Sequence, residues 1–146
     1  GSSSDDTPTL AWCSDTTTSI AGAVGTAVGT GSANTTAMLA LPCTSGAAFS
    51  ADAYAGGGLT DWFLPSKDEL NEMCNYSRNP ALPSTGTCTG TQNGAFAASS
   101  YGFADTSYWS SSQLNASSAY KQWLVKGNQS GGAKHYLVSV RPVRAF

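Results

Sequence analysis

The strongest local signal in the chain is a helix that begins after Ser66. Glu69 follows Ser66 by three residues, which is the spacing of a capping box. Leu70 and Met73 then recur at helical spacing and form an apolar stripe. The helix dipole favours carboxylates in the first turns, where the chain has Asp68, Glu69 and Glu72. The pattern predicts a helix with a structural role for its acids, preceded by a short apolar step at residues 61–64.

Weaker signals predict two further helices before this one and strands after it. Asn34 can cap a helix that reaches Leu41, and Thr44 or Ser45 can cap a second one through Ala55. Alternation of apolar and polar residues predicts strands at 9–15, 108–113, 119–126 and 135–143, the last interrupted by Pro142. Residues 130–133 are expected in a loop, and residues 16–31 in a loop or a strand pair. This order predicts an α+β fold with a small antiparallel sheet, two or three helices and long irregular loops.

Composition indicates one folded domain. Half of the 146 residues are Ser, Thr, Gly or Ala, yet 4 Trp, 6 Tyr and 5 Phe supply a core. Gly1–Ser2 resembles a cloning remnant and residues 1–7 a flexible tail, so the domain is expected over 8–146. No apolar run is long enough to cross a membrane, which argues against membrane insertion. The net charge of −2 disfavours nucleic acid as a partner, although residues 101–146 alone carry +4.

Four cysteines allow three pairings. The pairs Cys13–Cys43 and Cys74–Cys88 close the shorter loops and are favoured, and disulfides imply an oxidising compartment outside the cell. Four buried free thiols in a cytosolic protein are the alternative. One histidine and no C-x-x-C motif leave a zinc site short of ligands, so no metal and no cofactor are expected.

Motifs for catalysis are absent. The chain has neither a Gly-x-x-x-x-Gly-Lys phosphate loop nor a Gly-x-Ser-x-Gly nucleophile elbow. His135 has no acid near it in sequence and is interpreted as a surface or packing residue. Trp62, Trp109 and Trp123 are interpreted as core anchors rather than ligand contacts. The residues therefore favour a binding module over an enzyme.

Two separated stretches carry a family resemblance. They are Leu59–Leu70, with the sequence LTDWFLPSKDEL, and the pair Tyr108-Trp109-Ser110-Ser111-Ser112 and Val140-Arg141-Pro142-Val143-Arg144-Ala145-Phe146. In this order, over about residues 30–146, they resemble the Lcl C-terminal-type domain. That domain is a branch of the C-type lectin-like fold, related to formylglycine-generating enzymes. The resemblance implies a C-type lectin-like fold.

The segment between these motifs resembles the variable region of proteins diversified by a retroelement. In such proteins, miscopied adenines turn Asn codons into codons for all residues except Trp, Met, Gln, Lys and Glu. Here Gly127-Asn128-Gln129 is followed by four accessible residues, then Lys134, then four more. The alternative is an ordinary polar hairpin loop in an invariant protein. The resemblance implies a variable region at about 114–138, with the positions Leu114, Ser117, Ser118, Tyr120, Val125, Ser130, Gly131, Gly132, Ala133, His135, Tyr136, Leu137 and Val138.

Replaceable side chains need a backbone supported from below, because core packing penalises changes of volume. Gln122, Trp123, Gln129 and Lys134 fall outside the accessible set and are expected to be scaffold. Arg141 and Arg144 are expected to pair with carboxylates such as Asp61 or Asp105. The remaining expected scaffold residues are Trp62, Trp109, Val140, Val143 and Phe146.

These resemblances imply a non-enzymatic ligand-binding protein on a cell or virion surface. Its hypervariable face would bind a protein or glycan on a target surface. An invariant adhesin of the same fold, binding a polysaccharide, is the alternative, and the +4 tail suits an anionic glycan. The chain lacks the Glu-Pro-Asn, Gln-Pro-Asp and Trp-Asn-Asp motifs that calcium-dependent sugar binding uses. An oxidase like the formylglycine-generating enzymes would need a C-terminal cysteine pair, and residues 89–146 contain no cysteine.

Overall fold

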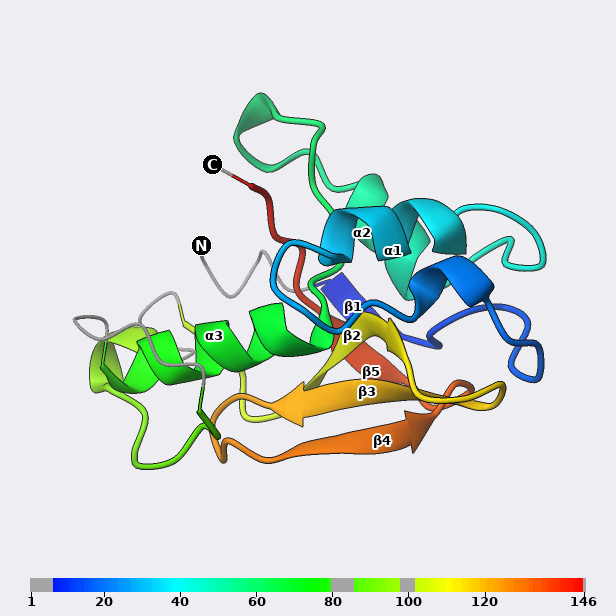
Figure 1. Ribbon diagram of the computed structural model, residues 1–146. Helices are drawn as coiled ribbons and strands as arrows, with labels where there is room; N and C mark the ends of the chain where they lie inside the picture. The colour runs from blue at the N-terminus through cyan, green and yellow to red at the C-terminus, as the bar shows by residue number, and fades with distance from the viewer. Residues whose placement is uncertain (1–6, 80–85, 98–101, 146) are drawn as a thin grey trace.

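The computed structural model describes residues 7–79, 86–97 and 102–145, and it has an α+β architecture. Five strands form one sheet in the order β1-β5-β2-β3-β4, with the helices packed above it in Figure 1. The strands are β1 (Thr7–Leu10), β2 (Ser107–Gln113), β3 (Ser118–Trp123), β4 (Gln129–Ala133) and β5 (Val138–Val140). The helices are α1 (Gly31–Met38), α2 (Ala47–Asp52) and α3 (Lys67–Arg78), with short 3₁₀ turns between them.

The sheet is mixed, whereas the sequence analysis predicted an antiparallel one. β2 pairs antiparallel with β3, and β3 pairs antiparallel with β4, but β2 and β5 run parallel through Tyr108 and Ser139. A parallel pair needs a long crossover, and here β3, β4 and their turns provide it. The chain thus leaves β2 at the centre, forms the outer hairpin and returns to the other side of β2.

Several predicted boundaries were wrong. The predicted strand 9–15 is a shorter strand that begins at Thr7, the last residue of the expected tail. Of the predicted strand 135–143, only β5 is a strand, and Val143 makes an isolated antiparallel bridge with Phe63. The expected loop 130–133 lies in β4, because its backbone pairs in register with β3.

The helix after Ser66 is confirmed. The Ser66 hydroxyl accepts from the Glu69 N–H, and the Glu69 carboxylate accepts from the Ser66 N–H at 2.7 Å. α1 starts four residues earlier than predicted, so Asn34 lies inside the helix and does not cap it. α2 is also shorter than predicted and starts after Gly46. Its first N–H, that of Ala47, donates to the Ala11 carbonyl instead of a hydroxyl cap.

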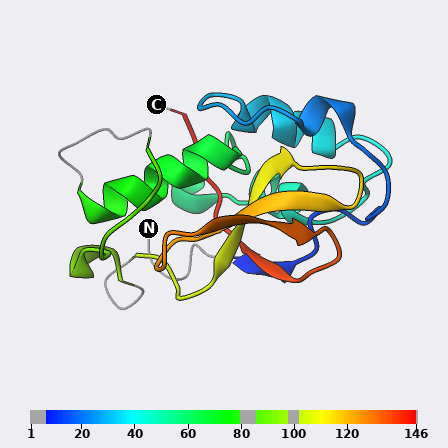
Figure 2. The same ribbon diagram turned by 60° about the horizontal axis from the view of Figure 1, so that its bottom comes forward.

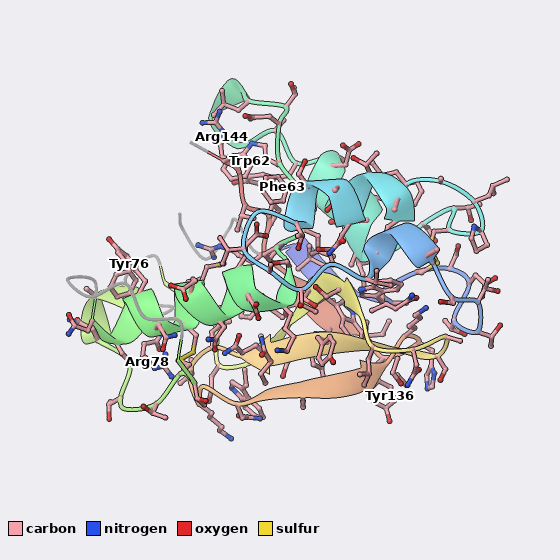
Figure 3. The ribbon with its side chains drawn as sticks, in the orientation of Figure 1. Trp62, Phe63, Tyr76, Arg78, Tyr136 and Arg144 are labelled. Carbon is pink, nitrogen blue, oxygen red and sulfur yellow. A yellow bond between two sulfur atoms is a disulfide. The ribbon has the colours of Figure 1, made fainter. Side chains whose placement is uncertain are left out.

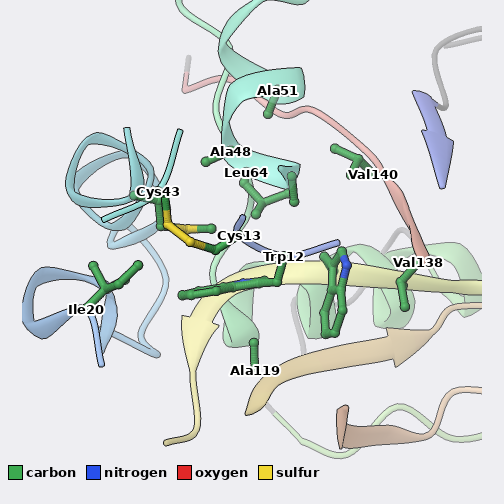
Figure 4. Close-up of a cluster of buried hydrophobic side chains, with 14 residues drawn as sticks. Trp12, Cys13, Ile20, Cys43, Ala48, Ala51, Leu64, Ala119, Val138 and Val140 are labelled. Carbon is green, nitrogen blue, oxygen red and sulfur yellow. A yellow bond between two sulfur atoms is a disulfide. The ribbon is translucent and has the colours of Figure 1, made fainter. Parts of the chain in front are cut away.

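Two apolar clusters fill the interior. The larger one surrounds Trp12, which is fully buried and donates from its indole to the Ser110 carbonyl at 2.7 Å. Figure 4 shows this cluster beside the disulfide Cys13–Cys43. The smaller cluster lies between α3 and the sheet, around Leu70, Tyr108 and Leu124. The second disulfide, Cys74–Cys88, ties the last turns of α3 to the segment that follows. The two bridges are the pairs that the shorter loops favoured.

Candidate binding surface

The outer hairpin of β3 and β4 carries most of the residues expected to vary. Its register pairs Tyr120 with Gly131 and Lys121 with Ser130, without a bulge. Because side chains alternate along a strand, Tyr120 faces one side of the hairpin and Lys121 the other. The side of Tyr120 faces α3, since the Lys67 ammonium lies 5.4 Å from the centre of the Tyr120 ring.

Two glutamines fix the hairpin to α3. Gln122 is fully buried, and its amide donates to Asn71 at 3.0 Å and to the Gly127 carbonyl at 3.2 Å. Gln129 donates both to the Gln122 amide oxygen and to the Lys67 carbonyl. Both were expected to be scaffold, and each makes hydrogen bonds that a shorter or apolar residue would lose.

A buried lysine anchors the turn between β4 and β5. The Lys134 ammonium donates to the Thr18 carbonyl and to the Gln113 amide oxygen, each at 3.0 Å, and lies 4.6 Å from the Trp12 ring centre. Burial lowers the pKa of this ammonium, and the nearby charge of Asp15 acts in the opposite direction. Gln113 in turn bonds the backbone of Ile20. Lys134 therefore joins the turn, the end of β2 and the long loop before α1.

The two turns at this end of the sheet expose their side chains. Leu114 is 46% exposed, Tyr136 52% and Leu137 69%. The rings of His135 and Tyr136 meet edge to face at 4.9 Å, and Figure 3 shows Tyr136 projecting from the sheet, away from Trp62 and Arg144. The backbone below is fixed, because the Lys134 N–H donates to the carbonyl of Ser117 at 2.9 Å. We call the exposed residues of these turns that were expected to vary the turn surface: Leu114, Ser117, His135, Tyr136 and Leu137.

The other expected variable positions do not all join the turn surface. Ser118 and Ala133 are half-buried beside it, and Ser130 and Gly131 are exposed along β4. Tyr120 is half-buried beside Lys67, and Val125 is half-buried at the opposite end of the hairpin. Two positions are buried. Val138 belongs to the larger core cluster, and a side chain at Gly132 would meet the aliphatic part of Lys121 at 2.8 Å. By the packing argument above, these two positions lie outside any freely replaceable surface.

The expected scaffold residues have several different roles. Trp109 is fully buried and donates to the Leu10 carbonyl. Trp123 is half-buried, so it is not the core anchor that was expected. Its indole donates to Asp105 at 2.7 Å, and the Lys126 ammonium lies 3.7 Å from its ring centre. Trp62 is half-buried against the edge of Tyr54.

The two C-terminal arginines hold the last segment in different ways. Arg144 forms the predicted pair with Asp61 through two hydrogen bonds, at 2.9 and 2.7 Å, and these bonds lower the pKa of Asp61. Arg141 is buried over the Phe103 ring and donates to the Gly102 carbonyl. Val140 is fully buried and Val143 half-buried. The expectation for Phe146 falls outside the described residues.

Two shallow depressions flank the hairpin, and the sequence analysis predicted neither. The one on the side of α3 is lined by Lys67, Asn71, Tyr120, Lys126 and Gln129, among others. The one on the opposite side is lined by Asp105, Lys121, Trp123, Tyr136, Leu137 and Val138, with Thr106 and Ser107. Nothing in the sequence indicated that Lys67 and Lys121 line these depressions, because a lone lysine in a helix or strand carries no signal for binding.

The ranges that the structure describes contain no group of three or more His, Cys, Asp or Glu side chains placed to hold a metal ion. His135 lies exposed on the turn surface, with the Tyr136 ring at its edge. In the same ranges, no helix combines the length and the hydropathy that crossing a membrane requires.

The fold and this surface define a small α+β domain that contains two disulfides. The hairpin of β3 and β4 forms one side of its sheet. The chain belongs to the Lcl C-terminal domain family, whose family model matches residues 1–144. Comparisons with curated proteins and with solved structures gave no match.

Proposed function

We propose that this chain is a non-enzymatic binding protein with a C-type lectin-like domain, whose turn surface and adjoining hairpin residues are diversified by a retroelement. The observation that carries the proposal is that residues outside the accessible set and residues within it lie in different environments. Three of the four positions named above that the code of such an element excludes, Gln122, Gln129 and Lys134, hold the hairpin through buried or part-buried hydrogen bonds. The fourth, Trp123, bonds Asp105 at the surface. Most accessible positions are exposed or half-buried around them.

The turn surface has the composition of a protein-binding face. Tyr136 and His135 offer rigid amphipathic rings, and Leu137 and Leu114 add apolar contact among Ser and Gly residues. Tyr with small neighbours is also the composition of antibody loops, where it gives contact area at a low cost in conformational entropy. The partner on this proposal is a protein or glycan on a target surface. The two disulfides support a location outside the cell, on a cell or virion surface.

Two small libraries test the proposal. One randomises His135, Tyr136 and Leu137 within the accessible set, and the matched one randomises Gln122, Gln129 and Lys134 over all residues. Both are displayed on yeast and scored by resistance to protease. We expect most clones of the first library to fold and few of the second. Equal folding in both would remove the basis of the proposal.

The native locus offers an independent test. Diversification predicts a near-copy of codons 108–146 that differs only where the copy carries adenines, together with a reverse transcriptase gene. Sequencing past the coding region would reveal both. Their absence would favour the second candidate, an invariant adhesin that binds an anionic polysaccharide. That candidate rests on the +4 charge of residues 101–146, and it predicts binding to heparin that collapses between low and high salt.

A further inference from the structure

Within the described ranges, no strand pairs with the outer edge of β4. β4 is the last strand of the sheet, at the bottom of the molecule in Figure 1 and turned towards the viewer in Figure 2. In an antiparallel pair, every second residue bonds to the neighbouring strand and the residues between point their N–H and C=O groups outward. The bonds from the Lys134 N–H to Ser117 and from the Trp123 N–H to Asn128 show which residues bond to β3. With this register, the N–H and C=O groups of Gly131 point away from β3. The N–H groups of Gln129 and Ala133 point the same way.

This edge lacks the features that usually protect one. Its sequence, Gln-Ser-Gly-Gly-Ala, has no charge and no proline, and its register with β3 has no bulge. Ser130 and Gly131 are exposed. The opposite edge strand, β1, contains Pro8, which cannot donate to an added strand. The Ala133 carbonyl already accepts from Tyr136, so an added strand would pair chiefly along 129–131 and with the Ala133 N–H.

The two depressions beside the hairpin set the chemistry of an added strand. A residue placed opposite Gly131 would point to the side of Tyr120 and Lys67, and its neighbours would point to the side of Lys121 and Trp123. The lysines of these two sides are Lys67, Lys121 and Lys126. The acids among them are engaged, because Asp68 pairs with Lys67 at 3.6 Å and Asp105 accepts from Trp123. The pair with Asp68 engages Lys67 as well, so three lysines against two acids leave the surface beside the edge with a net charge of +1, and it is partly aromatic.

The geometry points to β4 as a docking site for an extended, acidic segment of a partner protein, which adds a strand to the sheet and places alternate side chains on the two sides of the hairpin. This inference rests on the proposed function and adds the form in which the partner binds. Main-chain hydrogen bonds do not depend on side chains, so they supply affinity that survives diversification. A second copy of this chain fits the edge poorly, because it would bring the same three lysines against these.

Amide hydrogen exchange followed by NMR tests the inference. The probe is a blocked heptapeptide that alternates valine and glutamate, and its control has lysine in place of glutamate. We expect millimolar acidic peptide to slow exchange at Gly131 and Ala133 at least tenfold, and the lysine peptide to leave both unchanged. No slowing with the acidic peptide, or equal slowing with both, would overturn the inference. Slowing that depends on protein concentration without peptide would assign the edge to a second copy and overturn it as well.

Two variants of Gly131 distinguish binding through its backbone N–H from an effect of an added side chain. Gly131→Pro removes the outward N–H without removing a bond to β3, and Gly131→Ala retains the donor. The alanine side chain would meet only the end of Leu114, at 2.8 Å. We expect the proline variant to lose peptide binding at least tenfold and the alanine variant to keep it. If Gly131→Pro fails to fold, Ala133→Pro replaces it. Peptide binding that survives either folded proline variant would refute strand addition, whereas the library and locus results would still decide the proposed function.

Discussion

The ammonium of Lys134 lies 3.0 Å from the amide oxygen of Gln113, at the base of the turn that exposes His135 and Tyr136. The two residues stand at opposite ends of the β2–β5 crossover, and the Thr18 carbonyl completes the site. The exposed turn between β4 and β5 is thus joined through one buried side chain to the loop before α1. Replacing that side chain tests whether the turn depends on it.

Lys134→Met should lower the free energy of unfolding by about 2–4 kcal/mol. Methionine fills a similar volume but cannot donate. The Thr18 carbonyl and the Gln113 amide oxygen, which keeps its bond from the Ile20 N–H, would therefore each lose a hydrogen bond from a charged donor, worth about 1.5–3 kcal/mol. Lys126→Met is the control, because its ammonium only covers the exposed side of Trp123 and should cost less than about 1 kcal/mol. Urea denaturation measures both. Equal losses would show that Lys134 does not anchor the turn.

Leu137 and Val138 are neighbours with opposite environments, so they form a matched pair. Leu137 is 69% exposed and Val138 is 8% exposed in the larger core cluster. Leu137→Ala should change the free energy of unfolding by less than about 0.5 kcal/mol, as surface changes do. Val138→Ala should lower it by about 1–2 kcal/mol through lost burial and a cavity. A larger loss for Leu137→Ala in denaturant titrations would contradict the division between turn surface and core.

The sequence predicted what short-range chemistry determines. The capping box at Ser66 was found because both partners lie within four residues. The Arg144–Asp61 pair joins residues far apart in the chain, and it was predicted only as one of two alternatives, Asp61 or Asp105. Asn34 was misplaced as a cap because its use is not local. Its amide donates to the Gly25 carbonyl and to Ser111, which is 77 residues away.

The hairpin of β3 and β4 was predicted only in part. β4 has the sequence Gln-Ser-Gly-Gly-Ala, which has no strand propensity, and it is a strand only because β3 pairs with it. The parallel β2–β5 contact was unpredictable for a similar reason, since Tyr108 and Ser139 meet only after the hairpin has folded. Lys134 was identified as scaffold through family resemblance, but its partners Thr18 and Gln113 had no sequence signal.

Asp15 should make the loop before α1 sensitive to acid. Its pKa is lowered to about 2, chiefly by the backbone N–H of Thr17, with further bonds from the hydroxyl and N–H of Thr18. The unfolded chain, with a pKa near 3.8, therefore binds more protons between these values. The contribution of Asp15 to stability is complete above pH 3.8 and is lost as the pH falls towards 2.

Urea midpoints measured between pH 5 and pH 2 check this expectation. Asp15→Asn should remove the share of the acid dependence that lies between pH 3.8 and 2. Thr18→Val removes only one hydroxyl donor, so it should raise the pKa of Asp15 in the folded protein part of the way towards 3.8. The stability lost between pH 3.8 and 2 should then be smaller. If Asp15→Asn and the unchanged protein lose stability in parallel over this range, the loop does not depend on the ionised carboxylate.

The disulfide Cys74–Cys88 should stabilise the far end of the hairpin more than the turn surface. Arg78, at the end of α3, donates to the carbonyls of Leu124 and Val125 at 2.6 and 2.7 Å, and burial lowers the pKa of its guanidinium. The Cys88 carbonyl lies where a side chain at Gly127 would stand. The bridge and Arg78 together therefore hold the turn at residues 124–128.

Replacing both cysteines of this bridge with alanine should lower the free energy of unfolding by about 3 kcal/mol, from the closure of a loop with a sequence separation of 14. Amide exchange at residues 124–128 should speed up more than exchange at 134–137, because Lys134 holds the second turn independently. The double variant Cys13→Ala/Cys43→Ala is the control, since that bridge lies in the core beside Trp12 and should affect the whole domain. If removing Cys74–Cys88 accelerated exchange equally in both turns, the two ends of the hairpin would not be supported separately, and the turn surface would depend on this bridge as well.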